Sequence, residues 1–168
     1  MNKREWTTKK ILKEIISTLI LFFIISTVIN YIRKPDISED IYGYTLQDLK
    51  GSSIDFKNYK GKPLIVHFWA TWCPTCKLEA SNIESLSKEY NVVSIAVNSG
   101  SRDLIESFMS EHDLSYTVIS DSSGALAKKF NIEAYPTTLI YDKDGVLKFT
   151  EVGYSTTVGL KARVEIIN

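Results

Sequence analysis

The longest run of hydrophobic positions in the chain lies near its amino end. Residues 15–32 contain no charged side chain and are rich in Ile, Leu and Phe. A helix rises about 1.5 Å per residue, so this run would extend about 27 Å, close to the roughly 30 Å hydrocarbon core of a bilayer. Basic residues flank the run unequally, five before it and two after it: Lys3, Arg4, Lys9, Lys10 and Lys13, then Arg33 and Lys34. Because basic flanks stay in the cytoplasm, we expect one transmembrane anchor with residues 1–14 in the cytoplasm and residues 35–168 outside.

Two alternatives to an anchor are considered for this segment. A cleaved signal peptide has a shorter apolar stretch and a small-x-small cleavage site, whereas this run ends in Ser-Thr-Val-Ile-Asn-Tyr-Ile. A helix buried in a protein core is the second alternative, which the basic clusters on both sides fit poorly. No cysteine precedes Cys73, so a lipid-modified cysteine next to the membrane is excluded. The pattern therefore favours an uncleaved anchor.

In the rest of the chain the apolar runs are shorter and alternate with segments of helical spacing, as in a folded α/β domain. Residues 64–69 are almost continuously apolar after a Gly-Lys-Pro turn, which predicts a central strand buried on both faces. Residues 75–90 place Leu78 and other apolar residues at helical spacing, and residues 102–112 do the same with Leu104. We therefore expect a buried strand followed by amphipathic helices whose apolar residues face the core.

The remaining elements are predicted in the same way, strands from short apolar or alternating runs and helices from apolar residues at helical spacing. We predict strands over 44–46, 54–56, 92–97, 117–119, 138–141 and 146–151, and helices over 125–130 and 156–167. The last two strands flank Asp-Lys-Asp-Gly, a hairpin turn whose glycine suits a positive φ. This order predicts an α/β fold, with a mixed sheet and helices on both of its faces. Residues 33–42 form a polar tether, and the folded domain covers residues 43–168.

Charge and composition exclude several classes of protein. The 168 residues are 44% hydrophobic and 24% charged, an ordinary globular composition. Net charge is zero, but residues 1–34 carry a net of +5 and residues 35–168 a net of −5. An acidic folded portion argues against nucleic-acid binding, because such affinity comes largely from neutralised phosphates. Two cysteines are too few for a disulfide-rich scaffold or for a zinc site made only of cysteine.

The candidate chemistry lies in the two cysteines, Cys73 and Cys76, which are separated by Pro74 and one further residue. Cys73 lies where the buried strand gives way to a helix, and the free N–H groups and dipole at a helix start favour a thiolate. A thiolate is the nucleophile of disulfide exchange. Cys76 follows one helical turn later, where it can resolve a mixed disulfide. Pro74 fits the first turn of a helix, where its missing N–H is not needed.

The sequence alone leaves other uses of this cysteine pair open. Zinc needs four ligands, and the chain adds only His67 and His112 to the two cysteines. Copper(I) binding by two thiolates is chemically reasonable for a soft metal. A permanent structural disulfide would close so short a loop that it would stabilise the fold little. Reversible redox chemistry without a cofactor or metal explains the pair best.

Two separate motifs resemble the thioredoxin-fold proteins over residues 43–168. The first is Phe-Trp-Ala-Thr-Trp-Cys-Pro-Thr-Cys-Lys at 68–77, and the second is Tyr-Pro-Thr-Thr at 135–138. The lead-in, the helical insert and the Glu three residues after the second Cys resemble the membrane-tethered TlpA/ResA/DsbE branch. Residues 96–100 and 153–163 are most similar to the suppressor-of-copper-sensitivity (ScsD) type. The resemblance implies a thioredoxin fold with an N-terminal hairpin and a helical insert, preceded by the transmembrane helix.

The resemblance assigns roles around the two cysteines. It implies that Cys73 attacks, that Cys76 resolves, and that Pro136 follows a cis peptide bond facing them. The backbone of Tyr135 would then pair with a partner chain, strand to strand, and Trp72 would cover the site and contact partners. Without the resemblance, Pro136 would be interpreted as the start of a strand. Trp69 is expected to pack in the core.

Two further residues, Glu79 and His67, could affect the reactivity of the two cysteines. Glu79 stands where ResA-like proteins carry an acid that tunes the cysteine pair, and its alternative is a solvated helix carboxylate. His67 stands six residues before Cys73, where thioredoxins place a buried acid that relays protons to the resolving cysteine. A neutral imidazole could accept the Cys76 proton, with a pKa near the usual ~6.5 or lower if buried. The alternative is a hydrogen-bonded strand histidine without a redox role.

These observations predict a thiol-disulfide oxidoreductase that is anchored in a bacterial cytoplasmic membrane and faces the periplasm or cell exterior. Its partners would be protein thiols or disulfides, with a membrane electron donor of the DsbD/CcdA type. Tethered relatives are mostly reductants, so the resemblance favours a reductase; apocytochrome c and copper proteins are among the clients it leaves open. Two alternatives are a copper(I)-binding protein using the same two cysteines and a non-catalytic interaction module.

Overall fold

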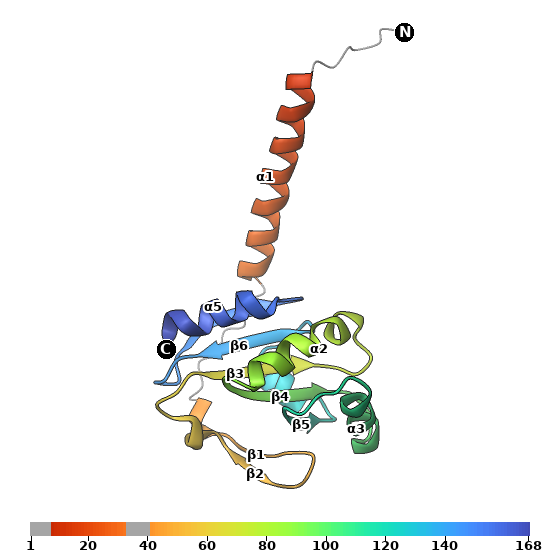
Figure 1. Cartoon of the computed structure of the whole chain (residues 1–168), viewed down its shortest axis with the longest axis vertical. Helices are drawn as coiled ribbons and strands as arrows, with labels where there is room; N and C mark the ends of the chain where they lie inside the picture. Colours follow the sequence, from red (N-terminus) through yellow and green to blue (C-terminus); the bar gives the residue numbers. More distant parts are fainter. Residues whose placement is uncertain (1–7, 33–40) are drawn as a thin grey trace. The chain divides into compact units, whose positions relative to one another are not determined.

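The computed structural model describes residues 8–32 and 41–168. The chain divides into two compact units, residues 1–34 and residues 35–168. The first contains helix α1 (Thr8–Ile32), and the second contains the sheet and the helices that flank it (Figure 1). Predictions for residues 1–7 and 33–40, which include most of the tether, lie outside the described residues.

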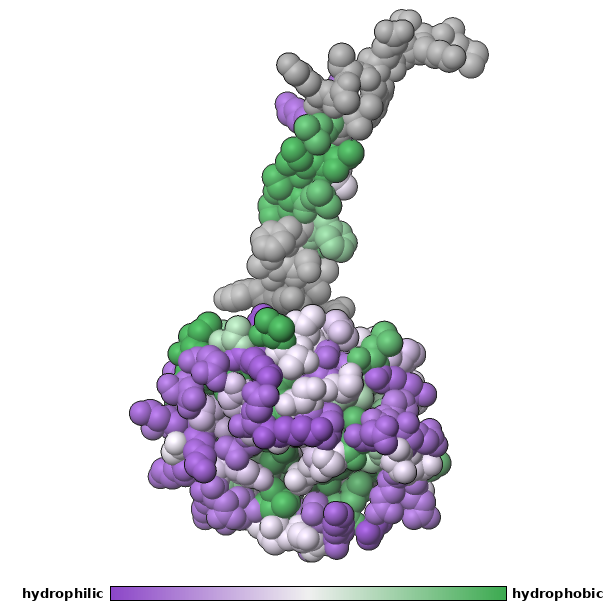
Figure 2. Space-filling model, in the orientation of Figure 1, coloured by the Kyte–Doolittle hydropathy of each residue, from purple (hydrophilic) through white to green (hydrophobic). Residues whose placement is uncertain are grey.

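Helix α1 forms over the apolar run near the amino end. Its described apolar side chains are largely exposed, among them Leu19 at 63% and Phe22 at 72%, and Figure 2 shows hydrophobic surface along this part of α1. Within the part of the chain that the structure describes, no helix combines the length and the apolar character needed to cross a membrane. The anchor over residues 15–32 stays a prediction from the sequence.

The second unit is built on a five-stranded sheet in the order β5-β4-β3-β6-β7. Strands β3, β4 and β5 run parallel, whereas β6 is antiparallel to β3 and β7 is antiparallel to β6. A separate two-stranded hairpin, β1–β2, precedes it. The strands are β1 (Thr45–Gln47), β2 (Ser53–Asp55), β3 (Leu64–Trp69), β4 (Asn91–Val97), β5 (Thr117–Asp121), β6 (Thr137–Tyr141) and β7 (Leu147–Val152). The predicted mixed α/β sheet is confirmed.

Helices cover both faces of this sheet (Figure 1). They are α2 (Pro74–Ser87), α3 (Arg102–Glu111), α4 (Ala125–Lys129) and α5 (Thr157–Ile167), together with two short 3-10 helices, η1 (Ile41–Gly43) and η2 (Phe56–Tyr59). Apolar side chains of α2, α3 and α5 share one core cluster with part of β3. Those of α4, η1 and η2 share a second cluster with the rest of β3. The two clusters are the two hydrophobic layers on either side of the sheet.

Strand β3 separates these layers and leads directly to the cysteines. All six of its residues are buried, and its five apolar side chains alternate between the two clusters. Trp69 belongs to one cluster, where its Nε1 donates to the Ser94 hydroxyl at 3.2 Å. Phe68 belongs to the other cluster and lies 5.3 Å from Phe130 between ring centroids. Because burial of each large apolar side chain contributes about 1.5–3 kcal/mol, this strand is a rigid base for the residues that follow it.

The structure corrects two details of the hydrophobic pattern. Ile41 and Tyr42, which the sequence assigned to the tether, are buried at 1% and 8% exposure. They pack in the domain. A Cβ added at Gly145 would lie only 2.5 Å from the Tyr42 ring, so the β6–β7 turn needs glycine at this position. Leu78 and Leu104 have helical spacing but are 73% and 59% exposed. Both lie on the solvent side of their helices, because the core face is filled by their neighbours.

Candidate active site

Cys73 and Cys76 lie at the start of α2 and are joined by a disulfide, with their Cα atoms 5.2 Å apart. Cys73 is the N-cap of α2 and has an extended backbone, and Pro74 takes the first helical position. The backbone N–H of Cys76 donates to the Cys73 Sγ at 3.2 Å. A free helix N–H aimed at this sulfur stabilises negative charge on it once the disulfide opens. The geometry therefore suits Cys73 as the sulfur that attacks and leaves.

The loop before β6 faces this sulfur. The Tyr135–Pro136 peptide bond is cis, the geometry that the resemblance implied. The carbonyl oxygen of Tyr135 lies 3.6 Å from the Cys73 Sγ. On the far side of the bond, the Pro136 carbonyl accepts a hydrogen bond from the Gly153 N–H at 2.8 Å. The loop thus places one backbone acceptor, the Tyr135 carbonyl, next to the reacting sulfur, and the proline that follows it has no N–H to donate.

Trp72 and Tyr135 border the cysteines at the surface. Their rings meet edge to face, with centroids 5.9 Å apart, and Trp72 is 59% exposed. The indole Nε1 donates to the Asn98 carbonyl at 3.0 Å, which fixes the ring although most of it is in solvent. An exposed aromatic ring held in one orientation presents area to a partner at little entropic cost. Contact with partners stays a prediction for both residues.

Glu79 is fully buried, unlike a solvated helix carboxylate. Its Oε1 accepts the N–H of Ser155 at 2.8 Å, whereas its Oε2 has no hydrogen-bond partner among the described residues. Burial raises the pKa of Glu79 to about 7, with a smaller contribution from the charge of Glu151 and an opposing one from the Ser155 N–H. Helix α2 therefore carries, three residues after Cys76, a buried carboxyl that changes charge near neutral pH.

His67 is buried on β3 between β4 and β6. Its Nδ1 lies 2.9 Å from the hydroxyl of Thr138. Burial lowers the pKa of His67 to about 3, so the ring stays neutral and is a weak base at neutral pH. This geometry favours the hydrogen-bonded strand histidine over the proton relay.

A metal site receives no support from the arrangement of ligands. In residues 8–32 and 41–168, no three His, Cys, Asp or Glu side chains lie close enough together to hold a metal ion. His112, the second histidine considered for zinc, lies with its Nδ1 2.9 Å from the Phe108 carbonyl and stacks on the Phe108 ring. It is the C-cap of α3 and is half-buried at the end of that helix.

Sequence reasoning missed three residues that hold the site together. Asn98 has a φ of 46° directly after β4, and its carbonyl orients Trp72. Asn82 of α2 and Ser155 of the β7–α5 loop are bonded to one another, as detailed below. The only signal for Asn98 is its place after a buried parallel strand, where functional residues gather. Nothing in the sequence pairs Asn82 with a residue 73 positions later.

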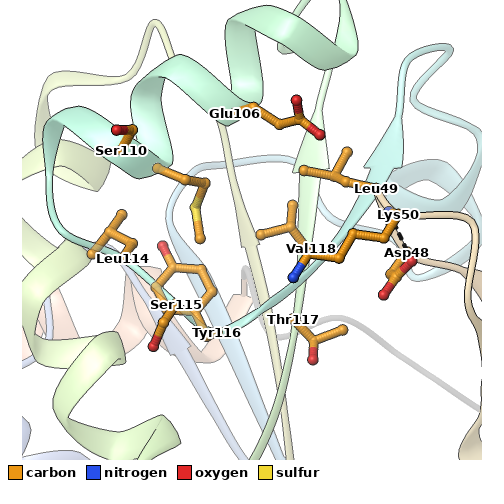
Figure 3. A pocket seen from close by; sticks show the side chains of 11 residues that line it. Asp48, Leu49, Lys50, Glu106, Ser110, Leu114, Ser115, Tyr116, Thr117 and Val118 are labelled. Atoms are coloured by element: carbon orange, nitrogen blue, oxygen red, sulfur yellow. Dashed lines mark hydrogen bonds between the residues drawn. The ribbon is translucent and has the colours of Figure 1, made fainter.

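Two of the pockets on this domain can be placed relative to the cysteines. One, of about 340 Å³, is lined by Asn98, Lys128 and Tyr135 among others, so it borders the candidate site. The other, of about 460 Å³, lies between the 48–50 turn, α3 and β5, and Figure 3 shows its mixed apolar and polar lining. Neither cysteine lines either of these pockets; both are largely buried, Cys76 at 2% exposure and Cys73, which follows the exposed Trp72 in the sequence, at 5%.

Comparisons with known proteins agree with this geometry. A model of the Redoxin family matches residues 33–164. A thioredoxin-like protein of Haemophilus influenzae is 34% identical over 158 residues, which cover 93% of this chain and 94% of that protein. The thiol-disulfide oxidoreductase ResA of Bacillus cereus is 29% identical over 149 residues, which cover 86% of each chain.

A solved structure supports the same assignment. StoA from Bacillus subtilis is 28% identical, with a TM-score of 0.62, and the match covers 71% of this chain and 93% of that one. The predicted thioredoxin fold is confirmed, and the cysteine pair occupies the start of the helix after the central strand. The chain therefore belongs to the redoxin family and is a thiol-disulfide oxidoreductase of the ResA and StoA type.

Proposed function

We propose that this protein reduces disulfides of partner proteins at the outer face of a bacterial cytoplasmic membrane. The observation that carries the exchange chemistry is the Cys73 sulfur, which accepts the Cys76 N–H and faces the Tyr135 carbonyl. The exposed Trp72 and the cis-Pro136 loop beside it offer a surface and a backbone edge to an extended partner segment. Small disulfides need neither feature, so protein disulfides are the substrate class that this site favours.

The exchange proceeds in two balanced steps. The Cys73 thiolate attacks one sulfur of the partner disulfide, forming a mixed disulfide and releasing the other partner sulfur as a thiolate. Cys76 then loses its proton to solvent and attacks the Cys73 sulfur, which forms the Cys73–Cys76 disulfide and releases the second partner thiolate. The partner gains two electrons and the protein loses two. A dithiol donor must then reduce the pair, and we propose a membrane donor of the DsbD/CcdA type.

Anchoring and orientation are part of the same proposal. Their support is the uncharged run over residues 15–32 and the five basic residues that precede it. The similarity of residues 96–100 and 153–163 to the suppressor-of-copper-sensitivity type likewise rests on the sequence. Copper(I) binding by the two cysteines stays an alternative, which titration of the reduced chain with copper(I) would reveal as tight, stoichiometric uptake.

Replacement of Cys76 with serine tests this proposal directly. The full chain carrying Cys76→Ser, expressed in a bacterial host, is expected to accumulate mixed disulfides between Cys73 and partner proteins, because the resolving thiol is gone. Non-reducing gels should show these adducts in the membrane fraction, and protease added to spheroplasts should digest them. The Cys73→Ser, Cys76→Ser double variant is the control and should show none. A folded Cys76→Ser chain without adducts would contradict the proposal.

A further inference from the structure

The loop between β7 and α5, residues 153–155, connects the cis-proline loop to α2. At its start, the N–H of Gly153 donates to the Pro136 carbonyl at 2.8 Å. Gly153 has a φ of 89°, a conformation that glycine adopts without strain and that turns the chain toward α2. At its end, Ser155 is held by side chains of α2. A displacement of this loop would therefore reach the Pro136 carbonyl.

Asn82 provides most of the side-chain contacts to this segment. Its Nδ2 donates to the Ser155 carbonyl at 2.9 Å and lies 3.2 Å from the Tyr154 hydroxyl. Its Oδ1 accepts the hydroxyl of Thr157 at 3.0 Å. One half-buried amide thus bonds three successive parts of the β7–α5 connection. Glu79, one turn earlier on α2, accepts the Ser155 N–H, so α2 binds both backbone groups of Ser155.

A short chain of contacts connects Ser155 with the reacting sulfur of Cys73. Ser155 and Gly153 are two residues apart, and Gly153 bonds to Pro136. The Tyr135 carbonyl, on the other side of the cis bond, lies 3.6 Å from the Cys73 Sγ. The Tyr154 ring is 54% exposed, with its hydroxyl fixed by Asn82. The Asn82 amide therefore contributes, together with Glu79, to the position of the partner-facing edge.

Other contacts hold α5 without Asn82. Thr156 is its N-cap and accepts the Gly159 N–H at 3.2 Å. Leu160 and Val164 are fully buried in the core, and Arg163 pairs with Glu151 of β7. Loss of the Asn82 bonds would therefore loosen residues 153–155 while α5 stays docked.

We infer that Asn82 is a positioning residue that holds the 153–155 loop, and through it the cis-Pro136 edge, in place for an extended segment of a partner protein. This inference rests on the proposed function. It assigns to Asn82 the recognition of polypeptide disulfides and no part in the sulfur chemistry itself. The chemistry at Cys73 with a small disulfide, which does not use this edge, should be independent of Asn82.

The test compares two disulfides and two Asn→Asp variants of the full chain. Asn82→Asp keeps the acceptor for Thr157 but removes both donated bonds, and the control Asn91→Asp removes the bond from Nδ2 to the Pro63 carbonyl at the distant end of β4. With pre-reduced protein, Asn82→Asp should lower the second-order rate constant for insulin about five- to tenfold, the loss expected for one or two hydrogen bonds. The rate constant for hydroxyethyl disulfide should change less than about twofold, and Asn91→Asp should change neither.

Equal slowing with both disulfides, or an unchanged rate with insulin, would overturn the inference. A wild-type chain that does not reduce insulin would overturn the proposed function as well, so the two failures are distinguishable. Thr157→Val is a third variant, which removes the hydrogen bond from the Thr157 hydroxyl to the Asn82 amide without adding charge; it should slow the reduction of insulin alone, by about two- to threefold. Urea midpoints for all variants identify any loss that comes from unfolding.

Discussion

Replacement of Cys73 with serine is expected to lower disulfide exchange by at least about 10³-fold. A serine hydroxyl is not ionised at neutral pH and cannot form the mixed disulfide, so the first step of exchange has no nucleophile. The backbone N–H that now reaches the Cys73 sulfur would still donate to the serine oxygen, so the helix start should keep its cap. The measurement is the rate of insulin reduction by the full chain with a dithiol as electron source.

Cys76→Ser is the matched control for this loss. It retains Cys73 and the first step, so it should form a mixed disulfide in a single turnover but should not release it. The structure predicts this asymmetry because only Cys73 is the N-cap of α2 and faces the Tyr135 carbonyl. Substantial turnover by Cys73→Ser, or equal behaviour of the two single variants, would contradict the assigned roles.

The second large effect concerns the buried carboxyl of Glu79 and the dependence of stability on pH. Its pKa is about 7 in the fold and 4.5 as the ordinary value. Below about pH 4.5 the group is protonated in both states and imposes no penalty. As pH rises toward 7 the unfolded state ionises first, so the folded state loses about 3 kcal/mol, at about 1.4 kcal/mol for each pH unit between the two values. Above that range the loss is constant.

Glu79→Gln should remove this pH-dependent loss. The amide oxygen can still accept the Ser155 N–H, and any cost of burying the amide nitrogen is the same at every pH. We expect the free energy of unfolding of the wild type to fall by about 3 kcal/mol relative to Glu79→Gln between about pH 4 and about pH 8. Urea unfolding of the oxidised chain measures it, with the exposed Glu133→Gln as control. Parallel pH profiles for wild type and Glu79→Gln would refute the buried, raised-pKa carboxyl.

The sequence predicted those parts of the molecule that depend on local order. The apolar run at 64–69 is β3, and the cysteines that follow it lie at the start of α2, as helix signals near Pro74 indicated. These features follow from burial on both faces of a strand and from the chemistry of a helix start. Both features depend on residues that are neighbours in the sequence, so they can be recognised without knowledge of the fold.

Features that depend on distant contacts could not be predicted in this way. Glu79 is buried because Ser155, 76 residues later, lies against α2. Ile41 looked like part of a polar tether, yet it is buried at 1% exposure beneath the sheet. Leu78 has the spacing of a core residue but is 73% exposed. In each case the tertiary arrangement, which no short window contains, decides what the side chain contacts.

His67 illustrates the limit of transferring a role by position. Its place six residues before Cys73 suggested a proton acceptor for Cys76. The ring is buried beside the Thr138 hydroxyl, and burial lowers its pKa to about 3, which makes it a weak base; the proton-acceptor role itself stays a prediction. Sequence position identified a buried polar residue of β3, but its basicity follows from desolvation, which only the packed structure reveals.

Disulfide exchange by this protein requires an ionised Cys73 sulfur at the start of α2. The direct measurement is the rate of iodoacetamide alkylation against pH, made on the full chain with Cys76→Ser so that a single thiol reacts. We expect a midpoint at or below about pH 7, lowered by the N–H of residue 76, and a return to about 8.5 when the chain is unfolded in urea. A midpoint near 8.5 in the folded chain, unchanged by urea, would contradict this expectation.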